Sequence, residues 1–386
     1  MIFPPTSLTL SGDRFTVIYQ LAGTDEAEAR AKIKGICLEQ TVELPEELLP
    51  DDDIRAEVVG RLEWLHQADA NIFEAAISYA VETTGFELPQ LLNVMFGNTS
   101  MQPHIRVERL ELPERLLQTF KGPRFGQSGL RALLQAYGRP LLCTALKPLG
   151  LPAKNLADLA GQFALGGIDL IKDDHGLANQ PFHPFHERVC RCAEAVNTAN
   201  QKTGYRCLYA PNISAPAQQI VERAYLAKEA GAGGLMIIPG LVGLDSLRLL
   251  AEDDGLGLPV ISHPAYWGSY VTHPQQGVAH RLTYGLLPRL AGADATIFVN
   301  YGGRFSFTPA DCRGIVAGAS EPLGRLKPIF PIPGGGMTLA RLPEMVQFYG
   351  PEVILLIAGG LYAHGPNLLE SCRQFRALVD RQGVED

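Results

Sequence analysis

The pattern of apolar and polar positions changes character near residue 135. Before that point, strand-like alternation and helical spacing follow each other without strict order, which is typical of a compact α+β domain. The sequence predicts, in turn, a strand at 14–21, a helix at 25–39, strands at 55–66 and 72–81, a helix at 88–96 and a strand at 104–112. We therefore expect residues 1–135 to form an α+β domain of the ferredoxin-like type.

From residue 136 onward, short apolar runs alternate regularly with helical patterns. Buried strands are predicted at 141–146, 168–172, 207–210, 234–238, 260–263, 296–300, 328–332 and 353–357. Helical spacing lies between them at 154–165, 187–200, 217–230, 276–290, 339–349 and 368–379. Nearly continuous apolar strands that alternate with helices indicate a parallel sheet covered by helices. Eight such units predict a (β/α)₈ barrel over residues 136–386, carrying the active site.

Composition narrows the classes of function. Of the 386 residues, 46% are hydrophobic and 19% are charged, as in globular enzymes. The net charge of −8 argues against binding to nucleic acid or to an anionic membrane, because both need clustered Lys and Arg. No apolar run is long enough to predict a membrane span, and the first residues do not resemble a signal peptide. The seven irregularly spaced cysteines predict reduced thiols in a cytoplasmic protein.

Polar side chains follow the second barrel strand without a break, at Lys172, Asp173, Asp174 and His175. The active site of such a barrel lies at the C-terminal ends of the strands, so this cluster should face the barrel mouth. Lys172 and Asp174 share one face of the strand, and a buried ion pair would explain them. The alternative is a metal site, in which CO₂ adds to the neutral amine of Lys172. The resulting carbamate would join Asp174 in binding a hard cation such as Mg²⁺.

Two glycine pairs follow the last two barrel strands, at Gly335–Gly336 and at Gly359–Gly360. Glycine lets backbone N–H groups approach an anion closely, and barrel enzymes often bind phosphate at these two strand ends. We therefore expect a phosphate site there, with tight-turn geometry as the alternative.

Other strand ends carry single candidate residues. Lys147 ends the first barrel strand just before a proline, which frees it from the sheet ladder. His263 ends the fifth strand, where it could contact a substrate hydroxyl or simply pack. Asn300 and Arg304 follow the sixth strand as candidate substrate-binding residues. Arg304 could contact a phosphate or a carboxylate, or remain in solvent.

Several of these motifs resemble the large subunit of ribulose-bisphosphate carboxylase (RuBisCO). The resemblance covers most of the chain and is strongest over residues 118–200. It rests on Phe120-Lys121-Gly122-Pro123, Tyr137-Gly138-Arg139-Pro140-Leu141-Leu142, Lys147-Pro148 with Gly150, Ala153-Lys154-Asn155, Gly166-Gly167-Ile168-Asp169, Lys172-Asp173-Asp174 and Gln180-Pro181-Phe182. It implies a small α+β domain followed by a (β/α)₈ barrel.

The resemblance also implies a set of site residues and a second subunit. Asn98 matches the family's asparagine near the metal, and Glu39 matches an acidic residue of the same domain less closely. In the family this domain belongs to the partner subunit, so the resemblance implies a homodimer with the active site at the subunit interface. The metal ligands would be carbamylated Lys172, Asp174 and His175.

Departures from the family pattern argue against CO₂ fixation. The family has a second lysine after the strand-1 Lys-Pro, a glutamate in the metal triad, an arginine after the strand-5 histidine, a histidine at the end of strand 6, a serine after strand 7 and a lysine in the loop after strand 6. This chain has Leu149, His175, Pro264, Asn300 and Gly334 at the first five positions, and no lysine in the loop 301–308. Without the loop lysine, no side chain would bind the carboxylate that CO₂ addition creates. The absence of the arginine, the strand-6 histidine and the serine removes most of the second phosphate site. The sequence therefore resembles a RuBisCO-like protein that acts on a substrate with one phosphate.

The reaction implied by this resemblance is metal-dependent enolisation of a phosphorylated ketose, such as a methylthio-sugar phosphate, for isomerisation or enolase chemistry. The metal would polarise the carbonyl and stabilise the enediolate, while Lys147 or the carbamate moves the proton. His175 is softer than glutamate, so Mn²⁺ or Zn²⁺ could replace Mg²⁺. The alternatives are a decarboxylase of a phosphorylated 3-oxo sugar acid, a non-catalytic sugar-phosphate-binding scaffold, and a barrel aldolase that uses Lys147 as a Schiff base.

Overall fold

The chain forms two compact units. The computed structural model describes residues 6–50 and 53–382. The first unit contains Met1–Phe120 and Trp267–Thr283, and the second contains Lys121–Tyr266 and Tyr284–Asp386. The division into domains at residues 1–135 and 136–386 remains a prediction. Within the described ranges, no helix is long and apolar enough to cross a membrane.

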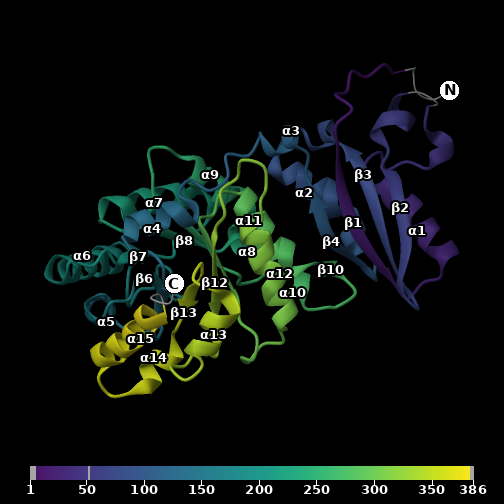
Figure 1. Cartoon of the computed structure of the whole chain (residues 1–386). Helices are drawn as coiled ribbons and strands as arrows, with labels where there is room; N and C mark the ends of the chain where they lie inside the picture. The colour runs from purple at the N-terminus through teal and green to yellow at the C-terminus, as the bar shows by residue number, and fades with distance from the viewer. Residues whose placement is uncertain (1–5, 51–52, 383–386) are drawn as a thin grey trace. The chain divides into compact units, whose positions relative to one another are not determined.

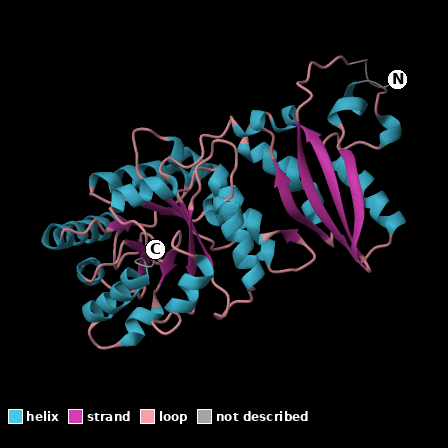
Figure 2. Ribbon diagram, viewed as in Figure 1, coloured by secondary structure: helices cyan, strands magenta, loops and turns pink. Residues whose placement is uncertain are grey.

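The first unit is built on a five-stranded sheet, seen face-on in Figure 2. Its strand order is β10-β4-β1-β3-β2, with antiparallel pairing throughout except between β10 and β4. The strands are β1 (Arg14–Ala22), β2 (Arg61–Asp69), β3 (Ile72–Ala80), β4 (Ile105–Glu111) and β10 (Gly277–Val278). The helices are α1 (Glu26–Glu39), α2 (Leu88–Phe96), α3 (Glu114–Leu117) and α10 (Gly268–Val271), with 3₁₀ turns at η1 (Glu46–Leu48), η3 (Val81–Thr84) and η4 (Asn98–Met101).

Apolar spacing explains how α1 lies against this sheet. Its buried residues are Ala29, Ile33, Ile36 and Cys37, which fall on one face of a 3.6-residue helix. Asp25 begins the helix by accepting a hydrogen bond from the backbone N–H of Glu28, at 2.9 Å. The sequence pattern and the cap therefore agree on where the helix starts and which face it buries.

Two predicted elements of this unit are wrong in part. The strand predicted at 55–66 begins only at Arg61, because Ile54–Val58 forms a π-helical turn (η2). Gly60 separates the two, and a Cβ there would lie 2.9 Å from the Tyr79 ring. The helix predicted at 276–290 starts as the short strand β10, which pairs with β4. Tertiary pairing with an open sheet edge overrides local helical spacing at that point.

The second unit is a barrel of eight parallel strands, of which β6, β7, β8, β12 and β13 are labelled in Figure 1. Its strands are β5 (Leu141–Leu146), β6 (Leu170–Asp173), β7 (Leu208–Ala210), β8 (Leu235–Ile237), β9 (Val260–Ser262), β11 (Ala295–Val299), β12 (Phe330–Gly334) and β13 (Ile354–Leu356). They run in the order β7-β6-β5-β13-β12-β11-β9-β8. Backbone hydrogen bonds from Gly233 and Gly234 to Tyr209, and from Ile213 to Met236, link the two ends of this order. The predicted fold class, an α+β unit followed by a (β/α)₈ barrel, is confirmed.

Helices lie between the strands as the alternation predicts. The longer ones are α4 (Gly126–Leu134), α5 (Ala153–Leu165), α6 (Phe185–Thr203), α7 (Ile220–Glu229), α9 (Leu244–Glu252), α12 (Pro309–Ser320), α13 (Leu342–Tyr349) and α15 (Leu368–Gln382). Shorter turns are α8 (Pro239–Val242), α11 (Leu287–Leu290), α14 (Gly359–His364), η5 (Ala217–Gln219) and η6 (Arg281–Leu286). Sequence reasoning missed α9 and α12. The capping box of Thr308 and Asp311 with Pro309 at the first position was an available signal for α12.

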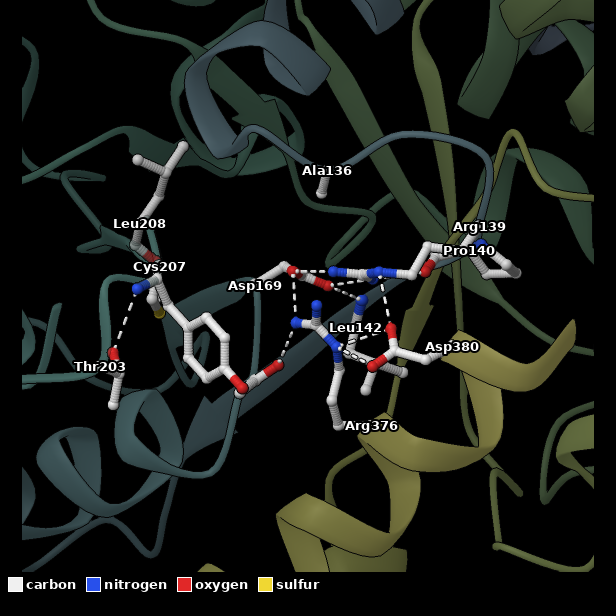
Figure 3. Close-up of polar contacts among 12 residues, drawn as sticks. Ala136, Arg139, Pro140, Leu142, Asp169, Thr203, Cys207, Leu208, Arg376 and Asp380 are labelled. Carbon is white, nitrogen blue, oxygen red and sulfur yellow. Dashed lines mark hydrogen bonds and ion pairs between the residues drawn. The ribbon is translucent and has the colours of Figure 1, made fainter. Parts of the chain in front are cut away.

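A buried ion-pair network closes the N-terminal end of the barrel (Figure 3). Arg139, just before β5, donates two hydrogen bonds to Asp169, just before β6, at 2.7 and 2.9 Å. Their side chains are only 7% and 6% exposed. From α15, Asp380 pairs with Arg139 at 3.1 Å and Arg376 pairs with Asp169 at 3.4 Å. The network therefore ties the last helix to the first two barrel strands.

We predict that Asp169→Ala destabilises the protein strongly. The change removes the carboxylate that accepts two hydrogen bonds from the buried Arg139 guanidinium and leaves Asp380 as its only ion-pair partner among the described residues. Breaking such a buried pair costs roughly 3–5 kcal/mol of unfolding free energy. Urea unfolding followed by circular dichroism measures it. The matched control is Asp245→Ala, which removes an exposed pair with Arg248 on α9 and should cost less than about 1 kcal/mol. Equal losses in the two variants would contradict a stabilising role for the network.

Candidate active site

Lys172 is the buried member of the polar cluster at the end of β6. Its side chain is 2% exposed, and its Nζ donates to the backbone carbonyl of Asp173 at 3.0 Å. Burial lowers the pKa of Lys172, and the nearby positive charge of Lys147 lowers it further. A low pKa favours the neutral amine, which is the form that can react with CO₂.

Asp174 joins the ends of two neighbouring strands. Its Oδ1 lies 3.0 Å from Nζ of Lys147, which follows β5, and 3.6 Å from Nδ1 of His175. Burial alone would raise the pKa of Asp174, but the hydrogen bonds from His175 and Lys147 outweigh it and hold that pKa well below its usual value. Asp174 is therefore an anion that links the two lysine-bearing strand ends.

His263 brings the end of β9 into the same cluster. Its ring stacks on that of His175, with centroids 5.0 Å apart and planes 23° apart. The ring Nδ1 accepts a hydrogen bond from the backbone N–H of Ala265 at 3.2 Å, which places the ring proton on Nε2. Burial, and then the positive charge of Lys172, hold the pKa of His263 well below its ordinary value. His263 is therefore a neutral imidazole that donates through Nε2.

Asp173 does not face the barrel mouth, although the sequence pattern predicted that it would do so together with Lys172, Asp174 and His175. It is fully buried, and it accepts hydrogen bonds from Tyr209 at 2.8 Å, the backbone N–H of Asn212 at 3.0 Å and Arg188 at 3.2 Å. Strand alternation sends it to the side opposite Lys172 and Asp174. Its bonds fix the end of β6, so Asp173 positions the cluster rather than belonging to it.

Asn300 and Arg304 are not brought into this cluster. The Asn300 side chain is fully buried against α13, where it accepts from the Tyr349 hydroxyl at 2.6 Å and contacts the sulfur of Met345. Arg304 is exposed, with its guanidinium 4.9 Å from the centre of the Phe305 ring.

The glycine residues after β12 and β13 lie beside each other. Gly335 and Gly336 have φ values of +106° and +66°, a region that favours glycine. A Cβ on Gly360 would collide with the backbone carbonyl of Met337, whereas one on Gly359 would meet no atom within 4 Å. Close backbone approach between the two segments thus requires glycine at 360 but not at 359.

Asn98 and Glu39 belong to the other compact unit. The Asn98 amide donates to Glu39 Oε1 at 3.0 Å, and both side chains are at least partly exposed. The two positions that the resemblance singled out in this unit are therefore neighbours, although 59 residues separate them.

Donor chemistry decides whether the cluster suits a divalent metal. Across 6–50 and 53–382, no group of three His, Cys, Asp or Glu side chains could hold a metal ion. Asp174 and His175 supply two donors, and the ammonium form of Lys172 supplies none. The residues therefore fit a hard cation only if Lys172 becomes a carbamate, a change that its burial favours by lowering the pKa of the amine.

A separate cavity of about 290 Å³ lies between the end of α6 and the starts of β7 and β8. Its polar lining includes Asn200. The side-chain amide of Asn200 donates to the Cys207 carbonyl at 2.9 Å and accepts from the Cys207 N–H at 3.0 Å. This region lies at the N-terminal ends of the strands and brings no candidate catalytic groups together.

Comparison with known proteins gives consistent relatives. The model of the ribulose bisphosphate carboxylase large chain, catalytic domain, matches residues 126–373. The chain is 39% identical over 368 residues to a 5-methylthioribulose-1-phosphate isomerase from Rhodospirillum rubrum, covering 95% of this chain and 96% of that protein. It is 33% identical over 383 residues to a 2,3-diketo-5-methylthiopentyl-1-phosphate enolase from Geobacillus thermodenitrificans, covering 95% and 92%.

A solved structure agrees with these relatives. The crystal structure of a Rubisco-like protein from Rhodopseudomonas palustris is 38% identical, with a TM-score of 0.88, and covers 97% of this chain and 99% of that one. The matched region includes every strand of the barrel and the polar ends of β5, β6 and β9. The chain therefore belongs to the ribulose bisphosphate carboxylase large chain family.

Proposed function

We propose that this protein is a RuBisCO-like enzyme that enolises a mono-phosphorylated ketose, 5-methylthioribulose 1-phosphate or a close analogue, without fixing CO₂. The observation that carries the proposal is the pairing of Lys147 with Asp174 beside the buried amine of Lys172. The relatives named as an isomerase and an enolase act on methylthio compounds with one phosphate, which supports the same substrate class here.

A divalent metal, Mg²⁺ in the first instance, would be held by carbamylated Lys172, Asp174 and His175. When bound, it would supply Lewis-acid polarisation of the substrate carbonyl. Asp174 is suited to this role because its pKa is held low and its carboxylate stays ionised. His175 is a softer ligand than a carboxylate, so Mn²⁺ or Zn²⁺ could serve as well.

Lys147 would transfer the proton next to the carbonyl. Its Nζ lies 3.0 Å from Asp174, and its side chain is 40% exposed, so it can reach both the cluster and a substrate. His263 would donate from Nε2 to a substrate hydroxyl, since its Nδ1 is already occupied by the backbone of Ala265. The carbamate of Lys172 is the competing base.

The phosphate would be held by backbone N–H groups around Gly335–Gly336 and Gly359–Gly360. The positions that bind a second phosphate in the family lack suitable side chains here. Pro264 and Gly334 cannot donate side-chain hydrogen bonds, and Asn300 is buried against α13. The loop 301–308 has no lysine to hold a new carboxylate. These features support a substrate with one phosphate and no carboxylation step.

We also propose a homodimer in the cytoplasm. Asn98 and Glu39 would act from a second copy of the chain, as the family resemblance implies. Large exposed apolar side chains occur in the segments after β5, β6, β8, β9 and β11, at Leu149, Phe182, Leu241, Tyr266 and Phe305. They follow the strand ends near which the family resemblance implies the second subunit. The seven free cysteines favour a reducing compartment.

Decarboxylation of a phosphorylated 3-oxo sugar acid is the second candidate reaction. The exposed guanidinium of Arg304 favours it, because a carboxylate substrate needs a cationic partner. Both reactions pass through the same enediolate, so the residues named above serve either one.

The first prediction separates these reactions. Incubated with 5-methylthioribulose 1-phosphate in D₂O, the protein should incorporate deuterium next to the carbonyl, as measured by proton NMR. Lys147→Met should slow this exchange by about 10²–10⁴-fold, the usual contribution of a general base. CO₂ release from a 3-oxo sugar acid phosphate, without exchange into the ketose, would instead support the decarboxylase.

The second prediction concerns Lys172. Lys172→Ala should reduce turnover on the order of 1,000-fold, because losing the metal site removes several kcal/mol of transition-state stabilisation. Lys154→Ala, on the exposed face of α5, is the control and should keep wild-type turnover. Circular dichroism checks that both variants fold. Wild-type activity in a folded Lys172→Ala protein would refute the proposed site.

The third prediction concerns metal and CO₂ together. Treatment with EDTA should abolish turnover, and Mg²⁺ with bicarbonate should restore it, because the carbamate completes the ligand set. Mg²⁺ added under CO₂-free conditions should restore much less. Activity that survives EDTA and dialysis would mean that the reaction needs no metal.

A further inference from the structure

Arg341 lies beside the glycine loop and has no part in the chemistry proposed above. It directly precedes α13, where its backbone N–H donates to the carbonyl of Thr338 at 3.1 Å. Its Nη1 lies 3.2 Å from the carbonyl oxygen of Gly336 and 3.5 Å from that of Gly302. One guanidinium therefore contacts the loop after β12 and the loop after β11.

Neighbouring side chains hold this guanidinium in place. Glu344, one turn along α13, lies 3.4 Å from Nε of Arg341 and accepts a hydrogen bond from the Tyr301 hydroxyl at 2.9 Å. The guanidinium carbon lies 5.8 Å from the centre of the Tyr301 ring. The Arg341 side chain is 26% exposed, so it is partly shielded from water. Arg341, Glu344 and Tyr301 together form a link between the two loops and α13.

The space that Arg341 occupies exists because both contacted residues are glycines. A Cβ on Gly336 would lie 2.9 Å from Nη1, and a Cβ on Gly302 would lie 3.1 Å from Nη2. Their φ values of +66° and +69° are also in the region that favours glycine. Each glycine is thus favoured by its backbone conformation, and a side chain at either position would displace the guanidinium from its present place.

Carbonyl contacts of this kind orient the adjacent peptide N–H groups. In a trans peptide the carbonyl and the following N–H point in opposite directions. Holding the Gly336 carbonyl against Arg341 therefore turns the N–H of Met337 away from the guanidinium, and the same holds for Gly303 after Gly302. Oriented N–H groups in a glycine loop form a binding site for an anion, and a nearby fixed positive charge strengthens it.

We propose that Arg341 is a positioning residue for phosphate binding, which clamps the loops after β11 and β12 so that their backbone N–H groups hold the phosphate of the substrate. The inference rests on the proposed function for the identity of that substrate. It differs from a direct contact, because it requires the two-carbonyl geometry of a guanidinium and not only a positive charge.

The test compares Arg341→Met, Arg341→Lys and a control. Arg313→Met is matched, since Arg313 also contacts α13, with its guanidinium 4.7 Å from the Phe348 ring centre, but lies on α12. Binding of inorganic phosphate is followed by ³¹P NMR, and kcat and KM are measured with 5-methylthioribulose 1-phosphate. Arg341→Met should weaken phosphate binding about 10-fold, because charge-assisted hydrogen bonds are lost. Arg341→Lys should restore less than half of the lost phosphate affinity, measured on a logarithmic scale. Arg313→Met should bind phosphate as tightly as the wild type.

Thermal unfolding separates positioning from stability, because a partly exposed arginine should change the midpoint little in any variant. Wild-type phosphate affinity in folded Arg341→Met, or full rescue by Arg341→Lys, would overturn the proposed clamp. If the wild type binds phosphate but does not exchange deuterium into the ketose, the proposed function fails, while weaker phosphate binding by Arg341→Met still supports the clamp. Absence of phosphate binding by the wild type would overturn both.

Discussion

A lysine amine buried at the end of β6, next to an ionised carboxylate, is the constraint on which the rest of the site depends. A buried amine is costly as an ammonium, so its burial lowers the pKa and favours the neutral form. Asp174 remains an anion because Lys147 and His175 donate to it. A buried amine with a lowered pKa, a fixed anion and the Lys147 amine thus lie at adjacent strand ends, which is the combination that the proposed carbamate-based metal site would use.

The two ends of the barrel use ion pairs in different ways. At the N-terminal end, Arg139 and Asp169 satisfy each other with two hydrogen bonds and are closed off by α15. At the C-terminal end, Lys147 and Asp174 form a single contact and remain partly open to water. A fully satisfied pair stabilises a structure, whereas an incompletely satisfied one leaves bonding capacity for a ligand. This division matches the general placement of stability and catalysis in barrels of this class.

Glycine has a structural role in this protein that goes beyond permitting turns. Gly336 and Gly302 leave the volume that the guanidinium of Arg341 fills, and Gly360 allows the loop after β13 to approach Met337. The segments after β11, β12 and β13 are therefore held together by a close backbone approach and by the guanidinium of Arg341. The arrangement would concentrate N–H groups and positive charge at the proposed phosphate site.

The eight barrel strands and the α+β unit could be predicted from the sequence, because nearly continuous apolar runs and polar strand ends are local features. The roles of Lys147, Lys172, Asp174 and His175 were inferred from these strand ends together with the family resemblance, and they remain predictions. Tertiary structure alone decided that β10 joins the first sheet, that Asn300 packs under α13, and that His263 stacks on His175. It also revealed Arg341 and the actual contacts of Asp173; both residues have hydrogen-bond partners as far as 39 residues away in the chain. Such contacts depend on which strand ends and loops become neighbours in space, and no local pattern of side chains encodes that distance.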